Sequence, residues 1–319
     1  MESSYKPAWF RDDSVFVSFA ETVGINKDGH DLFVVDAKTG ERTDVIDDKV
    51  AIDIRALVNG EGSTPTSRWV KNSDFTVAVP TYYDDRYNSA LNDLLEKPAF
   101  KGFTAKSLGE LTAEGLITHR AGHGSPSADM RDGDIPYIKV SDIRAGQVNI
   151  NPSNMVSEVV AQKFWKGSDS GLCEFDLITP IRTSKNIGEF AVLMPGQERV
   201  VLTKEMLVLR ATPESGVDNF YLLWALSLKV VRDQWRRIVF MQTNREDVGT
   251  RYQEITIPWT DDPEVAARVS SDFRNYYLGV EALRRKFITA LEDGGMHHVF
   301  LGTLASRDEE GESTTVEGR

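Results

Sequence analysis

The sequence is poor in cysteine and has no long apolar run. Cys173 is its single cysteine, which excludes an internal disulfide and a cysteine-rich metal site. No stretch of 18 or more apolar residues occurs, so the sequence predicts no membrane-spanning helix. The first residues, MESSYKPAWFRDD, lack the basic and then apolar order of a signal peptide. We therefore expect a cytoplasmic protein without membrane association.

The motifs of several common enzyme classes are also missing. There is no phosphate-binding loop ending in GK[ST], no G-x-G-x-x-G, no H-E-x-x-H and no G-x-S-x-G. A proline-containing tetrad of the kind expected of an adenine methyltransferase is absent as well. The five histidines show no metal-ligand spacing beyond a surface-like His297-His298 pair. We expect a protein that is not an enzyme and that uses no cofactor and no metal.

Acidic residues outnumber basic ones, and the formal net charge is −12. This excess is uneven, because residues 1–95 carry −7 and residues 306–319 carry −3. Between Lys101 and Thr260 there are 19 basic and 19 acidic residues. A locally basic surface is therefore possible in the middle of the chain, and the overall charge neither indicates nor excludes DNA as a partner.

The pattern of apolar residues predicts an α+β protein with four segments. Residues 1–95 form a mixed N-terminal module, and residues 96–260 form a mostly β module with helices. A long helix follows over 261–295, because Asp262 and Pro263 make a strong start signal and Gly294-Gly295 a stop. The acidic segment 296–319 is predicted to be disordered. One further helix is expected over 217–240, with a cap at Asp218 or Asn219.

The stretch GDIPYIKVSDI, residues 133–143, places polar side chains within a predicted strand. Because strand side chains alternate, Tyr137, Lys139 and Ser141 share one face, whereas Ile138 and Val140 share the other. One face suits a core and the other an anionic partner. Asp142 is expected to end the strand by accepting hydrogen bonds from turn amides.

Three polar clusters interrupt the strands of the central module. They are HRAGHGSPSADMRDGDIPYIKVSDI, DLITPIRTSKNIGEFAVL and FMQTNREDVGTRYQEITIPW. Arg, Lys, Ser, Asn and Gln bind phosphates and read base edges, although any one cluster alone is more often an ordinary polar turn. The residues predicted to contact DNA are His123, Ser125, Tyr137, Lys139, Ser141, Arg182, Ser184, Lys185, Asn244, Arg245 and Arg251.

Taken in this order, the clusters resemble the target recognition domain of the specificity subunit of type I restriction-modification systems. The matching pattern is LGEL at residues 108–111, GSP at 124–126, IPYIKVSDI at 135–143, DLITPIR, SKNIG, EMLVLRA, NFYLLWAL and ITIPW, followed by the long helix. It covers residues 108–291. A typical specificity subunit has two recognition domains and two long helices, so this chain resembles half of one. The stretch VFVSFAETVGINKDGHDLFVV, residues 15–35, more weakly resembles the tail of adenine-N6 methyltransferases fused to a recognition domain.

The resemblance implies a non-catalytic DNA-recognition subunit that directs a separate adenine-N6 methyltransferase in a restriction-modification or related phage-defence system. A metal-dependent DNA-processing enzyme and a protein-interaction scaffold remain as alternatives. A restriction or translocase subunit, or a second copy of the chain, is a further possible partner.

The long helix is expected to serve assembly, because its apolar residues recur every three or four positions and need a partner helix within the fold or from another chain. The predicted interface is Val269, Phe273, Tyr276, Val280, Leu283 and Phe287.

Overall fold

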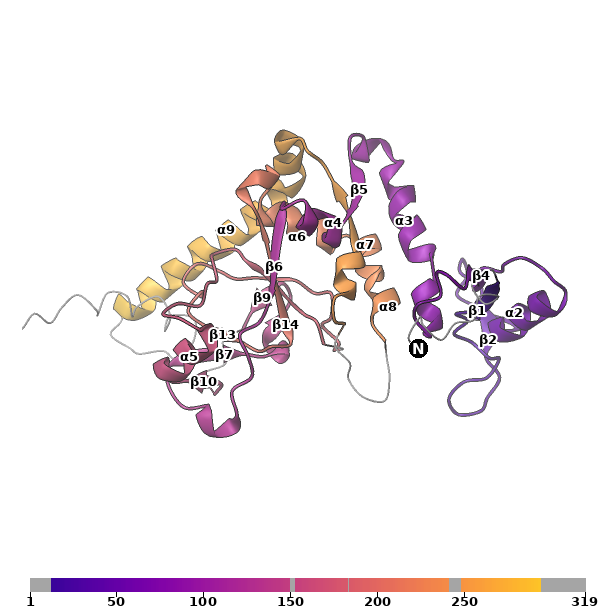
Figure 1. The fold of residues 1–319 in the computed structure, drawn as a ribbon, viewed down its shortest axis with the longest axis horizontal. Coiled ribbons are helices and arrows are strands. Elements are labelled where there is room, and N and C mark those ends of the chain that lie inside the picture. The colour runs from indigo at the N-terminus through magenta and orange to yellow at the C-terminus, as the bar shows by residue number, and fades with distance from the viewer. Residues whose placement is uncertain (1–12, 150–152, 183, 241–247, 294–319) are drawn as a thin grey trace, which may run out of the picture. The chain divides into compact units, whose positions relative to one another are not determined.

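The computed structural model describes residues 13–149, 153–182, 184–240 and 248–293 (Figure 1). Its backbone contacts separate into two compact units. The N-terminal unit runs to Tyr87 and includes Arg236–Ile238, and the central unit contains the remainder. Both helices and strands are present, which confirms the predicted α+β class. The residues Asn244 and Arg245, the predicted stop at Gly294-Gly295 and the tail 296–319 lie outside the described residues, and the division of the chain by role stays a prediction.

The N-terminal unit contains two separate two-stranded antiparallel sheets, β1 with β4 and β2 with β3. Its elements are β1 (Ser14–Ser18), β2 (Phe33–Val35), β3 (Arg42–Ile46), α2 (Lys49–Val58) and β4 (Ser67–Lys71). The Asp48 carboxylate starts α2 by accepting from the Ala51 amide at 2.8 Å. Val17, Val70 and Tyr83 form a small core. At the sequence boundary between the units lies the helix α3 (Arg86–Leu95).

A six-stranded sheet forms the centre of the second unit. In spatial order its strands are β6 (Ile117–Ala121), β14 (Met206–Ala211), β11 (Leu177–Pro180), β12 (Ala191–Val192), β9 (Gln147–Val148) and β8 (Ile143–Arg144). The pairings are antiparallel except for β12 with β9. All four residues of β11 are buried, which explains its nearly continuous apolar sequence.

Two smaller sheets, two short α-helices and two 3-10 turns also belong to the central unit. One sheet has the strand order β10 (Met155–Val156), β7 (Ile135–Ile138) and β13 (Val201–Leu202). The other pairs β15 (Thr256–Trp259) with β5 (Thr104–Ser107). The helices are α4 (Leu108–Ala113) and α5 (Glu158–Trp165), and the 3-10 turns are Ala128–Met130 and Val140–Asp142. Further 3-10 turns are Pro80–Tyr83, Pro98–Phe100, Pro213–Ser215 and Arg251–Glu254. β7 ends at Ile138, so the prediction of a strand running on through Ser141 is wrong.

The single helix predicted over 217–240 is divided into three. They are α6 (Asn219–Ser227), α7 (Lys229–Asp233) and α8 (Trp235–Ile238). The predicted cap is confirmed, because the Asp218 carboxylate accepts from the Tyr221 amide at 2.9 Å. Leu228 has an extended backbone with ψ of 133°, which breaks the helical hydrogen bonding after α6.

The long C-terminal helix α9 (Pro263–Asp293) is present and begins as predicted. The Asp262 carboxylate accepts from the amides of Glu264 and Val265 at 2.9 and 3.2 Å. The helix packs along α6 in the same unit, and Arg274 pairs with the Asp218 cap. No helix in the described part of the chain is both long and apolar enough to cross a membrane.

The face of α9 that is buried in the chain differs from the predicted apolar stripe. The buried residues are Ala266, Ser270, Tyr277, Glu281 and Ile288. On the predicted stripe, Val269, Phe273 and Val280 are half-buried, and Tyr276, Leu283 and Phe287 are exposed, with Leu283 70% exposed. One face of α9 is therefore covered within the chain, and a neighbouring apolar face remains open.

We predict that two substitutions five residues apart on α9 have very different effects on stability. Ile288→Ala removes a side chain that is 6% exposed and is expected to lower the free energy of unfolding by about 2–5 kcal/mol. Leu283→Ala changes an exposed side chain and should cost about 0.5 kcal/mol or less. Urea unfolding at a protein concentration too low for self-association measures both, and equal costs would contradict this packing.

Candidate nucleic-acid interface

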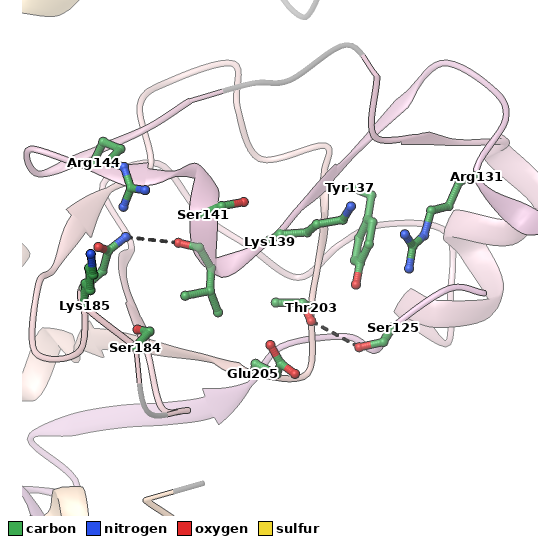
Figure 2. Close-up of a pocket in the computed structure, with 12 residues that line it drawn as sticks. Ser125, Arg131, Tyr137, Lys139, Ser141, Arg144, Ser184, Lys185, Thr203 and Glu205 are labelled. Carbon is green, nitrogen blue, oxygen red and sulfur yellow. Dashed lines mark hydrogen bonds between the residues drawn. The ribbon is translucent and has the colours of Figure 1, made fainter. Parts of the chain in front are cut away.

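A polar groove of about 520 Å³ opens on the central unit where β7 and three loops meet (Figure 2). Its lining comes from segments 125–144, 184–186 and 203–205. The lining residues are Ser125, Arg131, Tyr137, Lys139, Val140, Ser141, Arg144, Ser184, Lys185, Asn186, Thr203 and Glu205. We call this pocket the groove. It contains parts of the first two predicted polar clusters, which are separated by about 40 residues in the sequence.

Six of the residues predicted to contact DNA line the groove: Ser125, Tyr137, Lys139, Ser141, Ser184 and Lys185. Their role as contacts stays a prediction. Tyr137 is only 3% exposed, because every residue of β7 is buried. It therefore forms part of the groove wall, and the alternation expected for an open strand face does not apply.

Two cations are held beside the Tyr137 ring. The guanidinium carbon of Arg131 lies 5.3 Å from the ring centroid and the Lys139 ammonium 5.7 Å. Arg131 donates through Nε and Nη2 to the Pro126 carbonyl at 3.1 and 2.9 Å. Lys139 donates through Nζ to Oδ1 of Asn154 at 2.5 Å. Both charges are thus fixed in position by hydrogen bonds within the chain.

The end of β7 places Lys139 and the residues that follow it. The Lys139 amide donates to Oδ2 of Asp142 at 2.8 Å, which confirms that Asp142 ends the strand by binding a turn amide. The chain then turns through Val140–Asp142 into β8. Because of this turn, Val140 lines the groove and also packs against the core that contains Ile138. Burial raises the pKa of Asp142.

Arg144 and Lys185 lie together at the opposite end of the groove from Arg131 (Figure 2). Both side chains belong to exposed residues. Arg144 makes one long hydrogen bond, from Nη1 to the Ile143 carbonyl at 3.3 Å. Within the described residues, no ion pair involves either side chain. These two cations are therefore the ones available to an incoming anion.

Asn186 joins the two segments that carry these cations. It is 8% exposed, and its side-chain amide donates to the carbonyls of Val140 at 3.3 Å and Ile143 at 2.8 Å. The Gly146 amide also donates to the Glu189 carboxylate at 3.2 Å. These bonds hold the loop of Lys185 against the turn of Arg144.

The groove carries an excess of positive charge in an otherwise acidic chain. Arg131, Lys139, Arg144 and Lys185 line it, whereas Glu205 is its one acidic lining residue. The Glu205 carboxylate is paired with Arg182. An arrangement of this kind attracts anions, and its hydroxyl and amide groups add hydrogen-bond donors and acceptors.

The loop that carries Ser125 and Arg131 is fixed at both ends by glycines. A Cβ at Gly122 would lie 2.0 Å from the Thr203 carbonyl oxygen, so only glycine fits there. Gly133 has φ of +145°, and a Cβ on it would lie 2.4 Å from the backbone of Val156 and Ser157. Between these glycines, Ser125 reaches Thr203, with its hydroxyl 3.1 Å from the Thr203 hydroxyl.

His123 is predicted to contact DNA, and this stays a prediction; the structure places its ring among partners inside the unit. Its Nδ1 accepts from the Leu202 amide at 2.9 Å, and its Nε2 lies 2.9 Å from the Ser170 carbonyl. Both ring nitrogens are thus occupied inside the unit. Burial lowers the pKa of His123 to about 4, so the imidazole is neutral at pH 7 and anchors the loop before Ser125.

Two other predicted residues also lie elsewhere. Arg182 does not line the groove but pairs with Glu205, which does. Arg251 lies over the Phe240 ring, with its guanidinium carbon 4.0 Å from the centroid, and is not part of the groove lining. The third polar cluster therefore contributes no described residue to the groove, and its Asn244 and Arg245 are outside the described residues.

The sequence interpretation missed several lining residues. Arg131 is inside the first cluster and Arg144 directly follows it, so proximity to that cluster was an available signal. Thr203 and Glu205 lie in a short turn between two buried strands, β13 and β14. No sequence pattern marks that turn as part of the same site. Among the described residues, no group of three or more His, Cys, Asp or Glu side chains is placed to hold a metal ion.

Comparison with known proteins gives partial structural matches. No protein-family model matches the chain, and no curated protein matches it. The solved structures that are similar in part include the following three. One is a type I restriction-modification S subunit from M. genitalium, with a TM-score of 0.38, 12% identity and coverage of 59% of this chain and 41% of that chain.

The other two structures come from the same type of system. One is described by the words "complex assembly and conformational transition of the type I R-M system". It has a TM-score of 0.38 and 15% identity, and the match covers 66% of this chain and 48% of that chain. The HsdS subunit from Thermoanaerobacter tengcongensis has a TM-score of 0.37, 14% identity and coverage of 75% and 49%. Each match spans less than half of the solved chain.

We predict that acid destabilises the protein through His123. The unfolded chain binds a proton near pH 6.5, whereas the folded chain binds it only near pH 4, so stability falls as the pH is lowered between these values. From pH 7.5 to pH 5 the loss from this residue should be about 2 kcal/mol. Unfolding of the native protein and of His123→Asn at both pH values measures the difference, and an equal pH dependence of the two proteins would contradict the assignment.

Proposed function

We propose that the chain is a non-catalytic DNA sequence-recognition subunit that directs an adenine-N6 methyltransferase in a restriction-modification or related phage-defence system. The observation that carries this proposal is the positively charged groove. It brings together, in a chain of net charge −12, the two polar clusters that resemble parts of a target recognition domain.

The groove offers the two kinds of group that a sequence-reading site requires. Arg144 and Lys185 are exposed cations that suit phosphate oxygens, whose contacts position a protein on DNA without reading its sequence. Hydroxyl and carboxylate groups of Ser125, Thr203 and Glu205 suit base edges. Tyr137 and its two neighbouring cations form a rigid part of the groove wall.

The predicted apolar stripe of α9, half of whose residues are exposed, is the proposed partner interface. It comprises Val269, Phe273, Tyr276, Val280, Leu283 and Phe287, which recur at alternating intervals of four and three, as in a coiled coil. Burying one such side chain fully is worth about 1.5–3 kcal/mol before entropic costs. We favour the methyltransferase as the partner, because the N-terminal module resembles a methyltransferase tail. A second copy of the chain or a restriction or translocase subunit is the alternative.

Two rival functions make different predictions. A metal-dependent DNA-processing enzyme would cleave DNA when the purified chain is supplied with Mg²⁺. A protein-interaction scaffold that uses only α9 would bind no DNA. Salt-sensitive DNA binding without cleavage by the full chain supports recognition over both.

We predict that Arg144→Ala and Lys185→Ala each weaken DNA binding by about tenfold at 0.1 M salt and lower the slope of log affinity against log salt by about 1. Phosphate contacts are lost equally on every sequence, so the loss should be uniform across duplexes. Lys204→Ala is the matched control, because Lys204 is exposed and lies outside the groove lining. Fluorescence anisotropy over a salt series measures all three, and unchanged binding by both groove variants would contradict the proposal.

We predict that Tyr276→Asp combined with Leu283→Asp abolishes assembly with the partner while the central unit stays folded. Both side chains are more than half exposed, so the charges disturb only the open stripe. Leu278→Asp is the control, since Leu278 is 43% exposed and lies about 180° around the helix from Tyr276. Co-purification and methyl transfer to DNA report the complex.

The isolated chain is expected to transfer no methyl group, and the chain with its methyltransferase should do so. An intact complex after both Asp substitutions would show that another surface binds the partner. Methyl transfer by the isolated chain would contradict the non-catalytic assignment.

A further inference from the structure

Glu205 is the one acidic residue in the lining of a groove that otherwise carries four cations. It lies in the turn between β13 and β14, with its side chain 25% exposed. The turn is rigid, because the Ile181 amide donates to the Glu205 carbonyl at 2.9 Å and the Met206 amide donates to the Thr203 carbonyl at 3.1 Å. The carboxylate therefore points into the groove from a fixed position.

The ion pair with Arg182 leaves part of this carboxylate available. Arg182 bonds Oε1 of Glu205, and Oε1 is the one carboxylate oxygen that is bonded among the described residues. The pairing also limits the rotation of the carboxylate. Oε2 remains as an acceptor at the groove surface.

A fixed carboxylate selects against phosphate and for hydrogen-bond donors. A phosphate oxygen placed next to Glu205 would be repelled, so this region does not suit the DNA backbone. In the major groove, the donors that DNA presents are the exocyclic amines of cytosine and adenine. Adenine also presents the acceptor N7 beside its amine, which a carboxylate cannot satisfy, whereas cytosine presents its amine without an adjacent acceptor.

Resting on the proposed function, we propose that Glu205 is a specificity-determining residue that accepts a hydrogen bond from the N4 amine of one cytosine in the target sequence. Arg144 and Lys185, at the far end of the groove, take the phosphates, and Glu205 reads the base. Arg182 acts as a positioning residue for the carboxylate.

The test is selection of bound duplexes from a randomised library by the full-length wild-type chain and by Glu205→Gln. The wild-type protein should select cytosine at one position, preferring it to the other bases by roughly 5- to 150-fold. Gln both donates and accepts, and it pairs well with adenine. The selected base in Glu205→Gln should therefore change from cytosine towards adenine at that position, with the rest of the recognised sequence retained.

Glu158→Gln is the matched control. It removes the same charge from an ion pair, with Arg199, outside the groove, and the selected sequence should not change. Thermal unfolding of Glu205→Gln checks that this variant folds. Arg182→Gln keeps the Glu205 carboxylate but removes the ion pair that positions it, so this variant should show a weaker preference for cytosine and no preference for adenine.

The outcomes separate the two proposals. A selected sequence that is identical in the wild type and Glu205→Gln overturns the role of Glu205 and leaves DNA recognition intact. A uniform loss of affinity in Glu205→Gln, with the same selected sequence, assigns Glu205 a structural role only. Selection of no sequence by the wild-type chain overturns the proposed function and this inference with it.

Discussion

The groove depends on one buried side-chain amide, that of Asn186. By donating to two main-chain carbonyls 46 and 43 residues away in sequence, it holds the loop of Lys185 against the turn that leads into β8. Buried carbonyls need partners, so the amide satisfies a requirement of the fold and sets the spacing of the cations at the same time. The positive charge of the groove therefore comes from the way the fold brings four cationic side chains together, in a chain whose net charge is negative.

Elements governed by local chemistry were predictable from sequence. The start of α9 at Asp262 and Pro263, the cap at Asp218 and the hydrogen bond of Asp142 to a turn amide each depend on residues within three positions of one another. The α+β class followed from the period of the apolar residues. The first two polar clusters, parts of which line the groove, stood out in the sequence because Arg, Lys, Ser and Asn are concentrated in them.

Features set by tertiary packing were not predictable in the same way. The strand predicted to run through Ser141 ends at Ile138, because the Lys139 amide, which would continue the strand pairing, donates to the Asp142 carboxylate. Histidine occurs both in surface loops and in buried hydrogen-bond networks. His123 belongs to a buried network, and this follows only from the positions of Leu202 and Ser170, which the sequence does not indicate. The covered face of α9 lies beside the most regular apolar stripe: α9 packs along α6, and its buried residues include the small Ala266 and Ser270 as well as Tyr277.

The two glycines that bound the loop from Gly122 to Gly133 divide this region into a fixed frame and a variable insert. At each of these two glycines a neighbouring backbone occupies the space of a side chain, so neither position tolerates another residue. Between them, a Cβ on Gly124 would lie 2.4 Å from the Phe164 ring, whereas the other intervening positions already carry side chains. Exchange of side chains within this loop would therefore change the lining of the groove without redesign of the sheet beneath it.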